Sequence, residues 1–242
     1  MPFYPFTMFS TAKNPMSGAP LPLVRNPFLR RLAFFFVMAI GLSTSVWASP
    51  GLPLPPATQQ AGFAAKYSVL PDGRKAEADA VILVVSVADQ CLVVIRGGKA
   101  ERAYKVSTAK AGTGSKPNSD KTPLGWHRVS DWIGGDAVPG QVFVSRKAVK
   151  GEVLANTQWQ SNAGRDYVLT RILWLDGLEW GRNKGPGADS HSRFIYLHGT
   201  NQEHLLGQPA SHGCIRLSNH DVMVVYSLTA GHPTYVDIVE QF

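Results

Sequence analysis

Short runs of β-branched residues, separated by turn-forming clusters, fill the chain from Ala80 onward. The runs AVILVVSV (80–87) and CLVVIRGG (91–98) are joined by only three residues, a spacing that predicts a β-hairpin. RAYKVSTA (102–109) follows a glycine-containing turn and predicts a third strand of the same meander. Glycine, proline, asparagine and aspartate recur between such runs, so the pattern favours a mainly β fold.

The same pattern continues to the C-terminus and is interrupted by one clear helix signal. Ser218 is followed three residues later by Asp221, which is typical of a helix start, and the next apolar residues recur at helical spacing. Gly231 and Pro233 predict where this helix ends. We therefore expect a single domain, mainly β with one or two short helices, over residues 79–240. Its remaining predicted strands are LGWHRVS (124–130), QVFVSRKAV (141–149), YVLTRILWL (167–175), RFIYLHG (193–199) and TYVDIVE (234–240).

The N-terminal segment has a different composition. Three arginines precede the apolar run LAFFFVMAIGL (32–42), and small residues end the segment at Ala48. This order is typical of a secretory signal peptide, which we place over residues 1–48; an uncleaved N-terminal anchor is the alternative. Both predict export, and we expect the domain in the periplasm, with membrane contact only through an uncleaved segment. The Pro-rich stretch that follows predicts an extended linker over residues 49–78.

The net positive charge of the chain comes largely from this N-terminal segment. The 242 residues carry a formal net charge of +7, but residues 1–48 contain four Lys or Arg and no Asp or Glu, so +3 remains without them. The rest of the chain has no basic run with interleaved aromatic residues, which argues against a nucleic-acid partner. A mild positive charge suits weak attraction to an anionic polymer.

Two cysteines occur in the chain, in contrasting settings. Cys91 begins an apolar strand and is expected to be a small core residue. Cys214 lies between glycine and isoleucine in SHGCIRL (211–217), a polar setting that needs another explanation. The alternatives are a disulfide between the two, a metal ligand and a catalytic thiol. Exported domains tend to hold structural cysteines in bonded pairs.

A catalytic thiol requires a base and donors for an oxyanion. His198 ends the apolar strand RFIYLHG, a rigid platform for its side chain. Gly213 permits a tight turn, and the N–H groups of Gly213 and Cys214 are candidates to face a developing oxyanion. Arg216 is expected to stabilise charge, to brace the loop or to pair with an acid such as Asp221.

Zinc binding is the competing chemistry at this motif. His198, His212 and Cys214 are acceptable zinc ligands by residue type. The chain has no CxxC or HExxH motif, and the H-x-C spacing alone is a weak signal. We therefore expect no metal and no other cofactor.

Two stretches carry a resemblance to a known family. LHGT (197–200) and SHGCIRL (211–217) together resemble the signature of the L,D-transpeptidase catalytic domain, also called the YkuD domain. The segment YKVSTAKAGTGSKPNSDKTPLGWHRV (104–129) resembles an upstream part of the same family, which contains a Thr-Pro-x-Gly element. The resemblance covers residues 80–239 and implies a YkuD-like β-sandwich or barrel.

The resemblance implies an enzyme that acts on peptidoglycan stem peptides. Such enzymes attack a tetrapeptide between its third residue, a diamino acid such as diaminopimelate, and the terminal D-Ala. The acyl group then passes to an amine of another stem, which gives a 3→3 cross-link, or to an outer-membrane lipoprotein. The implied site comprises Cys214 as nucleophile, His198 as base and the Gly199 carbonyl as the group that orients it, with Ser211, His212 and Gly213 on the oxyanion loop and Arg216, Tyr196 and Thr122 toward the substrate.

The same residues are compatible with other functions. Transfer to water would make the domain an L,D-carboxypeptidase or another hydrolase, and loss of the chemistry would leave a catalytically silent wall-binding module. Two turn-rich segments match no part of the family pattern. Residues 132–166 are expected to form a long loop that caps the cleft, with a structural insertion as the alternative, and residues 175–193 are expected to form a cleft wall.

Overall fold

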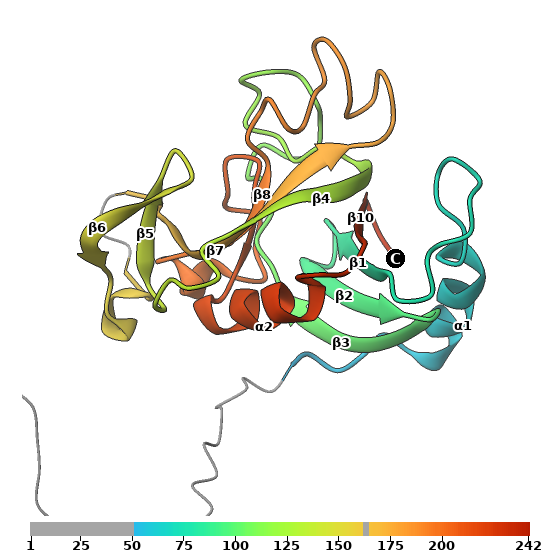
Figure 1. Cartoon of the computed structure of the whole chain (residues 1–242), viewed down its shortest axis with the longest axis horizontal. Coiled ribbons are helices and arrows are strands. Elements are labelled where there is room, and N and C mark those ends of the chain that lie inside the picture. The colour runs from blue at the N-terminus through green and yellow to red at the C-terminus, as the bar shows by residue number, and fades with distance from the viewer. Residues whose placement is uncertain (1–50, 162–164) are drawn as a thin grey trace, which may run out of the picture. The chain divides into compact units, whose positions relative to one another are not determined.

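The computed structural model describes residues 51–161 and 165–242 (Figure 1). The predicted signal peptide over residues 1–48 lies outside the described residues. The described residues belong to one compact unit. Within them, no helix is both long enough and apolar enough to cross a membrane.

Ten strands of the described chain form one mixed sheet. The order along the sheet is β3-β2-β1-β10-β4-β7-β5-β6, and β8 joins β7 to β9 off this path. The two α-helices are α1 (Ala57–Lys66) and α2 (Asn219–Thr229), and the two 3-10 helices are η1 (Asn156–Gln158) and η2 (Glu203–Leu205). The strands are β1 (Val81–Ser86), β2 (Cys91–Arg96), β3 (Lys99–Lys105), β4 (Gly125–Ile133), β5 (Gln141–Val144), β6 (Lys147–Val153), β7 (Val168–Gly177), β8 (Tyr196–Gly199), β9 (Ile215–Leu217) and β10 (Thr234–Val239).

The mainly β, single-domain prediction is confirmed. Strands β1, β2 and β3 form the predicted antiparallel meander, and β10 returns to pair with β1 in parallel. The predicted helix is also present as α2, and Ser218 caps it by accepting a hydrogen bond from the Asp221 backbone N–H at 2.9 Å. Local hydrophobic periodicity and capping chemistry therefore determine most of these elements.

The segment 132–166 differs from the predicted loop. The predicted strand 141–149 is instead a hairpin, in which β5 and β6 pair in antiparallel fashion and β5 also pairs with β7. Ser145 and Arg146 form the tip, with φ values of 48° and 67°. Two consecutive residues with positive φ suit a tight hairpin turn, because their twist matches that of the flanking strands.

Both faces of β1 are buried, and the two helices cover different clusters of side chains (Figure 1). Val222 and Val225 of α2 belong to the cluster that contains Leu83 and Val85. The opposite set of β1 side chains packs with Phe63 and Tyr67, which are 6% and 3% exposed. The extended linker expected over 49–78 therefore contains a helix. Phe63 of this helix and Tyr67, which directly follows it, complete a second core, because β1 is buried on both faces and needs cover on both sides.

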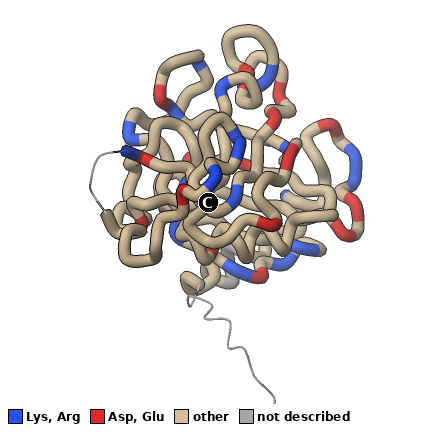
Figure 2. Tube along the Cα trace, turned by 60° about the vertical axis from the view of Figure 1, so that its left-hand side comes forward, with Lys and Arg blue, Asp and Glu red and all other residues tan. Residues whose placement is uncertain are grey.

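Charged residues of both signs are interspersed along the trace of the domain (Figure 2). Several pair across strands: Arg128 Nη2 of β4 lies 2.9 Å from Asp176 Oδ2 of β7, and Lys184 also contacts Asp176. Part of the basic charge is thus neutralised locally.

Candidate active site

Strands β8 and β9 bring the two halves of the predicted motif together. They pair in parallel, with His198 opposite Arg216 and Leu197 opposite Ile215. Directly paired residues point to the same face of a sheet, and so does a residue two positions away. His198, Arg216 and Cys214, which immediately precedes β9, therefore share one face. The sequence analysis missed β9, because a three-residue strand gives almost no periodic signal.

The Cys214 thiol is partly exposed and lies against the chain just before β8 and at its start. Its Sγ atom accepts a hydrogen bond from the Tyr196 backbone N–H at 3.4 Å and lies 3.4 Å from the Phe194 carbonyl oxygen. Desolvation raises the pKa of Cys214 to about 11, although the Tyr196 N–H opposes this shift. The resting thiol is therefore protonated at neutral pH. Cys91 and Cys214 are both free thiols.

The buried His198 ring is held by its own strand. Its Nδ1 atom lies 2.8 Å from the Gly199 carbonyl oxygen, which can only accept a hydrogen bond. Nδ1 therefore carries the proton, and Nε2 is left as a proton acceptor. Burial lowers the pKa of His198, an effect that the Asp166 carboxylate and the Gly199 carbonyl partly offset. The predicted base is thus neutral and has the tautomer needed to take a proton.

Close packing requires glycine at position 199. A Cβ atom there would lie 2.5 Å from Asn219 Oδ1 and 2.9 Å from the Leu169 carbonyl oxygen. The Asn219 side chain is itself fixed, because it accepts from the Thr170 hydroxyl at 2.5 Å and donates to the Thr200 carbonyl at 2.7 Å. The first residue of α2 therefore sets the position of the carbonyl that orients His198.

Arg216 is buried against other groups of the protein. Its side chain is 1% exposed, and its Nη2 atom donates to Asp166 Oδ2 at 2.5 Å. Further hydrogen bonds go to Gln202 Oε1 at 2.9 Å and to the Ala210 carbonyl at 3.0 Å. Of the roles expected for Arg216, the structure therefore favours bracing the loop. Its acidic partner is Asp166 rather than Asp221, a pairing over 50 positions that no local pattern signals.

The loop that carries Cys214 is fixed by hydroxyl groups. Ser211 Oγ donates to the Cys214 carbonyl at 2.6 Å and accepts from the Gly213 N–H at 3.2 Å. The Gly213 N–H, expected to face an oxyanion, is thus engaged within the loop. Thr122 is fully buried, and its hydroxyl donates to the Gly213 carbonyl at 3.0 Å while accepting from the Ala109 N–H. Its hydroxyl therefore positions the loop, and the contact of Thr122 with substrate stays a prediction.

Of the two other predicted residues, one belongs to this loop and one begins β8. His212 is exposed, and its Nδ1 atom lies 3.6 Å from Asp166 Oδ2. Tyr196 is 8% exposed, and its hydroxyl accepts a hydrogen bond from Arg146 Nη1 at 3.2 Å. Asp166 and Arg146 were both missed by the sequence analysis, because each comes from a segment without a recognisable motif.

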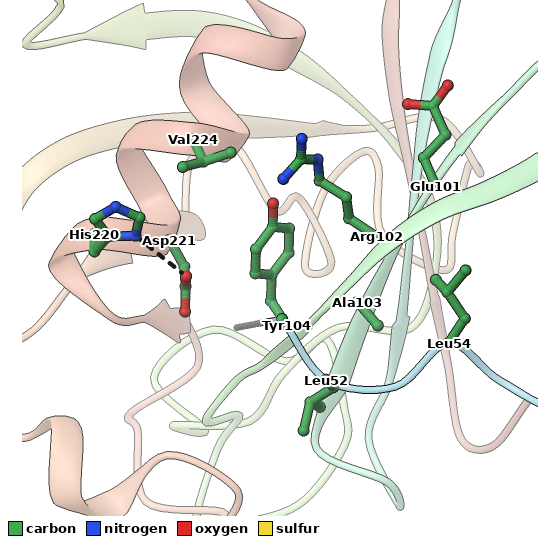
Figure 3. Close-up of a pocket in the computed structure, with 10 residues that line it drawn as sticks. Leu52, Leu54, Glu101, Arg102, Ala103, Tyr104, His220, Asp221 and Val224 are labelled. Atoms are coloured by element: carbon green, nitrogen blue, oxygen red, sulfur yellow. Dashed lines mark ion pairs between the residues drawn. The ribbon is translucent and has the colours of Figure 1, made fainter. Parts of the chain in front are cut away.

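His198, His212 and Cys214 were the alternative zinc ligands. Among residues 51–161 and 165–242, no three His, Cys, Asp or Glu side chains are grouped closely enough to hold a metal ion. A cavity of about 480 Å³ lies elsewhere, between β3 and α2 (Figure 3). Tyr104, His220 and Asp221 contribute to its lining, but none of the predicted site residues does.

The family model of the L,D-transpeptidase catalytic domain, YkuD, matches residues 80–238. A search of curated proteins found no match.

Solved structures that resemble the chain are distant in sequence. An L,D-transpeptidase from Mycobacterium smegmatis is 17% identical with a TM-score of 0.39, and the match covers 66% of this chain and 58% of that one. The cell shape determining protein Pgp2 (K307A mutant) from Campylobacter jejuni is 16% identical with a TM-score of 0.40, over 78% and 58%. An L,D-transpeptidase from Xylanimonas cellulosilytica is 19% identical with a TM-score of 0.37, over 76% and 80%. The chain thus spans less than two thirds of the first two proteins. The family model covers most of the described domain, and the chain belongs to the L,D-transpeptidase catalytic domain (YkuD) family.

Proposed function

We propose that the protein is an exported, cysteine-dependent L,D-transpeptidase that acts on peptidoglycan stem peptides. The observation that carries the proposal is the placement of Cys214 and His198 on one face of β8 and β9, with His198 Nδ1 hydrogen-bonded to the Gly199 carbonyl. This arrangement offers a thiol and a base of fixed tautomer on the same face of the sheet. Membership of the family supplies the class of reaction.

In the first step, His198 Nε2 takes the proton of the Cys214 thiol as Sγ attacks the carbonyl carbon of the third stem residue. The tetrahedral adduct then collapses, and the terminal D-Ala leaves as its nitrogen takes the proton from His198. An acyl-thioester on Cys214 remains. In the second step an acceptor amine attacks the thioester, His198 takes the amine proton, and the thiolate leaves and recovers its proton.

The resting charges support attack by a thiol that ionises during the reaction. The pKa of Cys214 is raised and that of His198 is lowered, both mainly by burial, so the neutral pair is favoured over a thiolate–imidazolium pair. The proton therefore moves when substrate arrives, as expected for general-base catalysis. No hydrogen bond joins the two side chains in the part of the chain described, and contacts of this kind often tighten only with substrate bound.

The location and the acceptor are part of the proposal. The signal-like segment 1–48 supports export to the periplasm, where stem peptides are accessible. N-terminal sequencing of the protein purified from periplasm tests cleavage after Ala48, and retention in the membrane fraction would favour an uncleaved anchor. An outer-membrane lipoprotein is a second candidate acceptor besides another stem.

Mass spectrometry of the purified protein incubated with tetrapeptide muropeptides tests the reaction. Loss of D-Ala together with a 3→3 linked dimer is the expected result. Loss of D-Ala that leaves only tripeptide would identify an L,D-carboxypeptidase. No reaction with a reduced Cys214 would indicate a silent wall-binding module. A carbapenem, which acylates the family's thiol, is expected to add its full mass to the protein at Cys214.

A further inference from the structure

Arg146 and the aromatic side chains around it form a group near Cys214 that is not part of the predicted motif. Arg146 comes from the tip of the β5–β6 hairpin, which lies beside β7 (Figure 1). Its guanidinium carbon lies 4.5 Å from the centre of the Trp174 ring and 4.7 Å from that of Phe194. Arg146 Nη1 also donates a hydrogen bond to the Tyr196 hydroxyl at 3.2 Å. Three aromatic side chains therefore hold the guanidinium in place.

The same residues connect this guanidinium to the nucleophile. The Phe194 carbonyl oxygen and the Tyr196 backbone nitrogen each lie 3.4 Å from Cys214 Sγ. The side chains of Phe194 and Tyr196 contact Arg146, and Trp174 and Cys214 both pack on the cluster of Tyr196. Phe194 and Tyr196 thus contact the thiol through their backbone and the guanidinium through their side chains, which places Arg146 on the flank of the site that a substrate would approach.

Two arginines, Arg216 and Arg193, act electrostatically on the Cys214 thiol, and they differ from Arg146 in what they bind. Arg216 is buried against Asp166. Arg193 donates from Nη2 to the Lys121 carbonyl at 2.7 Å and from Nη1 to the Gly114 carbonyl at 3.2 Å. Arg146 is partly exposed, and within the described ranges its only hydrogen bond is to Tyr196 and it has no carboxylate partner.

A guanidinium stacked on aromatic rings keeps its planar fork of donors available at the edge, which suits bidentate binding of a carboxylate. The aromatic contacts also restrict the side chain before a ligand arrives, so less conformational entropy is lost on binding. The hydrogen-bond partner of Arg146 is a hydroxyl, so no ion pair with a described carboxylate neutralises its charge.

We propose that Arg146 binds a carboxylate of the donor stem, next to the bond that Cys214 attacks. The inference rests on the proposed function. Two carboxylates flank that bond, one on the leaving D-Ala and one on the side chain of the diamino acid, and both offer the chemistry that Arg146 recognises. Arg146 is thus a specificity-determining residue for stems that are charged at this position.

The test compares the full-length protein, Arg146→Gln and Arg146→Lys on three tetrapeptide stems. One stem is unmodified, one carries a carboxamide on D-Ala, and one carries a carboxamide on the diamino acid side chain. The measured quantity is kcat/KM for release of the terminal residue. Arg74→Gln is the matched control, because Arg74 is exposed and paired with Asp72, outside the site. Thermal unfolding of each variant verifies that it folds.

Arg146→Gln is expected to lower kcat/KM on the unmodified stem about 10- to 100-fold, the effect of losing a charge-assisted hydrogen bond. Amidation of the carboxylate that binds should lower wild-type kcat/KM by a similar factor and leave Arg146→Gln nearly unchanged. The amidated stem on which the effects of amidation and of Arg146→Gln do not add identifies the carboxylate that Arg146 binds. Arg146→Lys should recover only part of the loss, because a lysine cannot bind a carboxylate bidentately.

Three results would overturn the inference. An Arg146→Gln protein with wild-type kcat/KM would show that the guanidinium binds nothing relevant. An equal loss on all three stems would show that Arg146 only supports Tyr196 and the hairpin; in both cases the proposed function stands. If the wild-type protein releases no residue from any stem, the proposed function fails, and the inference fails with it.

Discussion

Arg216 Nη2 and Asp166 Oδ2 lie 2.5 Å apart in an ion pair that joins β9 to the segment before β7. The guanidinium is 1% exposed, whereas Asp166 keeps a quarter of its side chain accessible. Asp166 also raises the pKa of His198 and lies 3.6 Å from His212. One carboxylate outside the motif thus balances the positive charge of the motif's arginine and acts on its base.

Loss of this carboxylate should destabilise the protein. Asp166→Ala leaves the buried Arg216 unpaired, and we expect the free energy of unfolding to fall by about 3 kcal/mol, the lower end for a broken buried pair. Urea denaturation measures this change. Asp72→Ala is the control: it breaks the exposed Asp72–Arg74 pair, and the free energy of unfolding is expected to stay nearly unchanged because solvent screens this pair. Equal effects of the two variants would contradict the role assigned to Asp166.

Removal of the thiol should abolish the reaction without unfolding the protein. Cys214→Ala is expected to release no D-Ala, because no other described thiol lies on this face of the sheet. Its thermal midpoint should stay within a few degrees of wild type, since the side chain is only partly buried. Cys91→Ala is the converse control, with activity retained and about 1 kcal/mol of stability lost from a core residue that is 8% exposed.

The pH dependence of catalysis should reflect the low pKa of His198. Burial holds this pKa below 6.5, so the acid limb of the kcat/KM profile is expected below pH 6.5. The Asp166 carboxylate favours the imidazolium, so Asp166→Asn should move the limb to still lower pH. Asp72→Asn, remote from the site, should leave the profile unchanged. A limb that moves to higher pH in Asp166→Asn would show that the carboxylate does not act on His198.

The pH dependence of stability should have a contribution from His127. Its buried ring contacts the Gly125 carbonyl and the Ser190 hydroxyl, each at 2.9 Å, and burial lowers its pKa to about 4. Because the folded pKa is the lower one, the unfolded chain takes up the proton first. Stability is therefore expected to fall by about 2 kcal/mol from pH 6.5 to 5.

Denaturation curves at several pH values measure this slope. His127→Gln should flatten it, whereas His232→Gln, which replaces a histidine side chain that is 40% exposed, should retain it. A slope that persists unchanged in His127→Gln would assign the effect to other groups.

Glycine at position 199 should be irreplaceable. Gly199→Ala places a methyl group 2.5 Å from Asn219 Oδ1, and we expect a loss of about 1 to 3 kcal/mol from overpacking. Displacement of the Gly199 carbonyl should also free the His198 ring, so kcat should fall by a larger factor than KM changes. Gly62→Ala is the control, since no atom lies within 4 Å of the added Cβ and the residue is helical; it should be neutral or slightly stabilising.

Much of the fold follows from local sequence, and the exceptions have physical causes. The meander β1–β3 and the capped helix α2 were predicted because periodicity and capping act between residues close in the chain. Helix α1 was missed because its burial depends on a partner surface of β1 and β2 that lies far along the sequence. The β5–β6 hairpin was missed because two positive-φ residues without glycine form its tip.

The sequence by itself determined the class of the fold and the motif that carries Cys214 and His198, since residue type and spacing are local properties. Tertiary structure alone decided how these residues are supported. Asp166 reaches Arg216 and Arg146 reaches Tyr196 across 50 positions each, and Thr122 reaches the carbonyl of Gly213 across 91. Such contacts arise when strand pairing brings distant segments together, and burial then fixes both the charge and the orientation of each group.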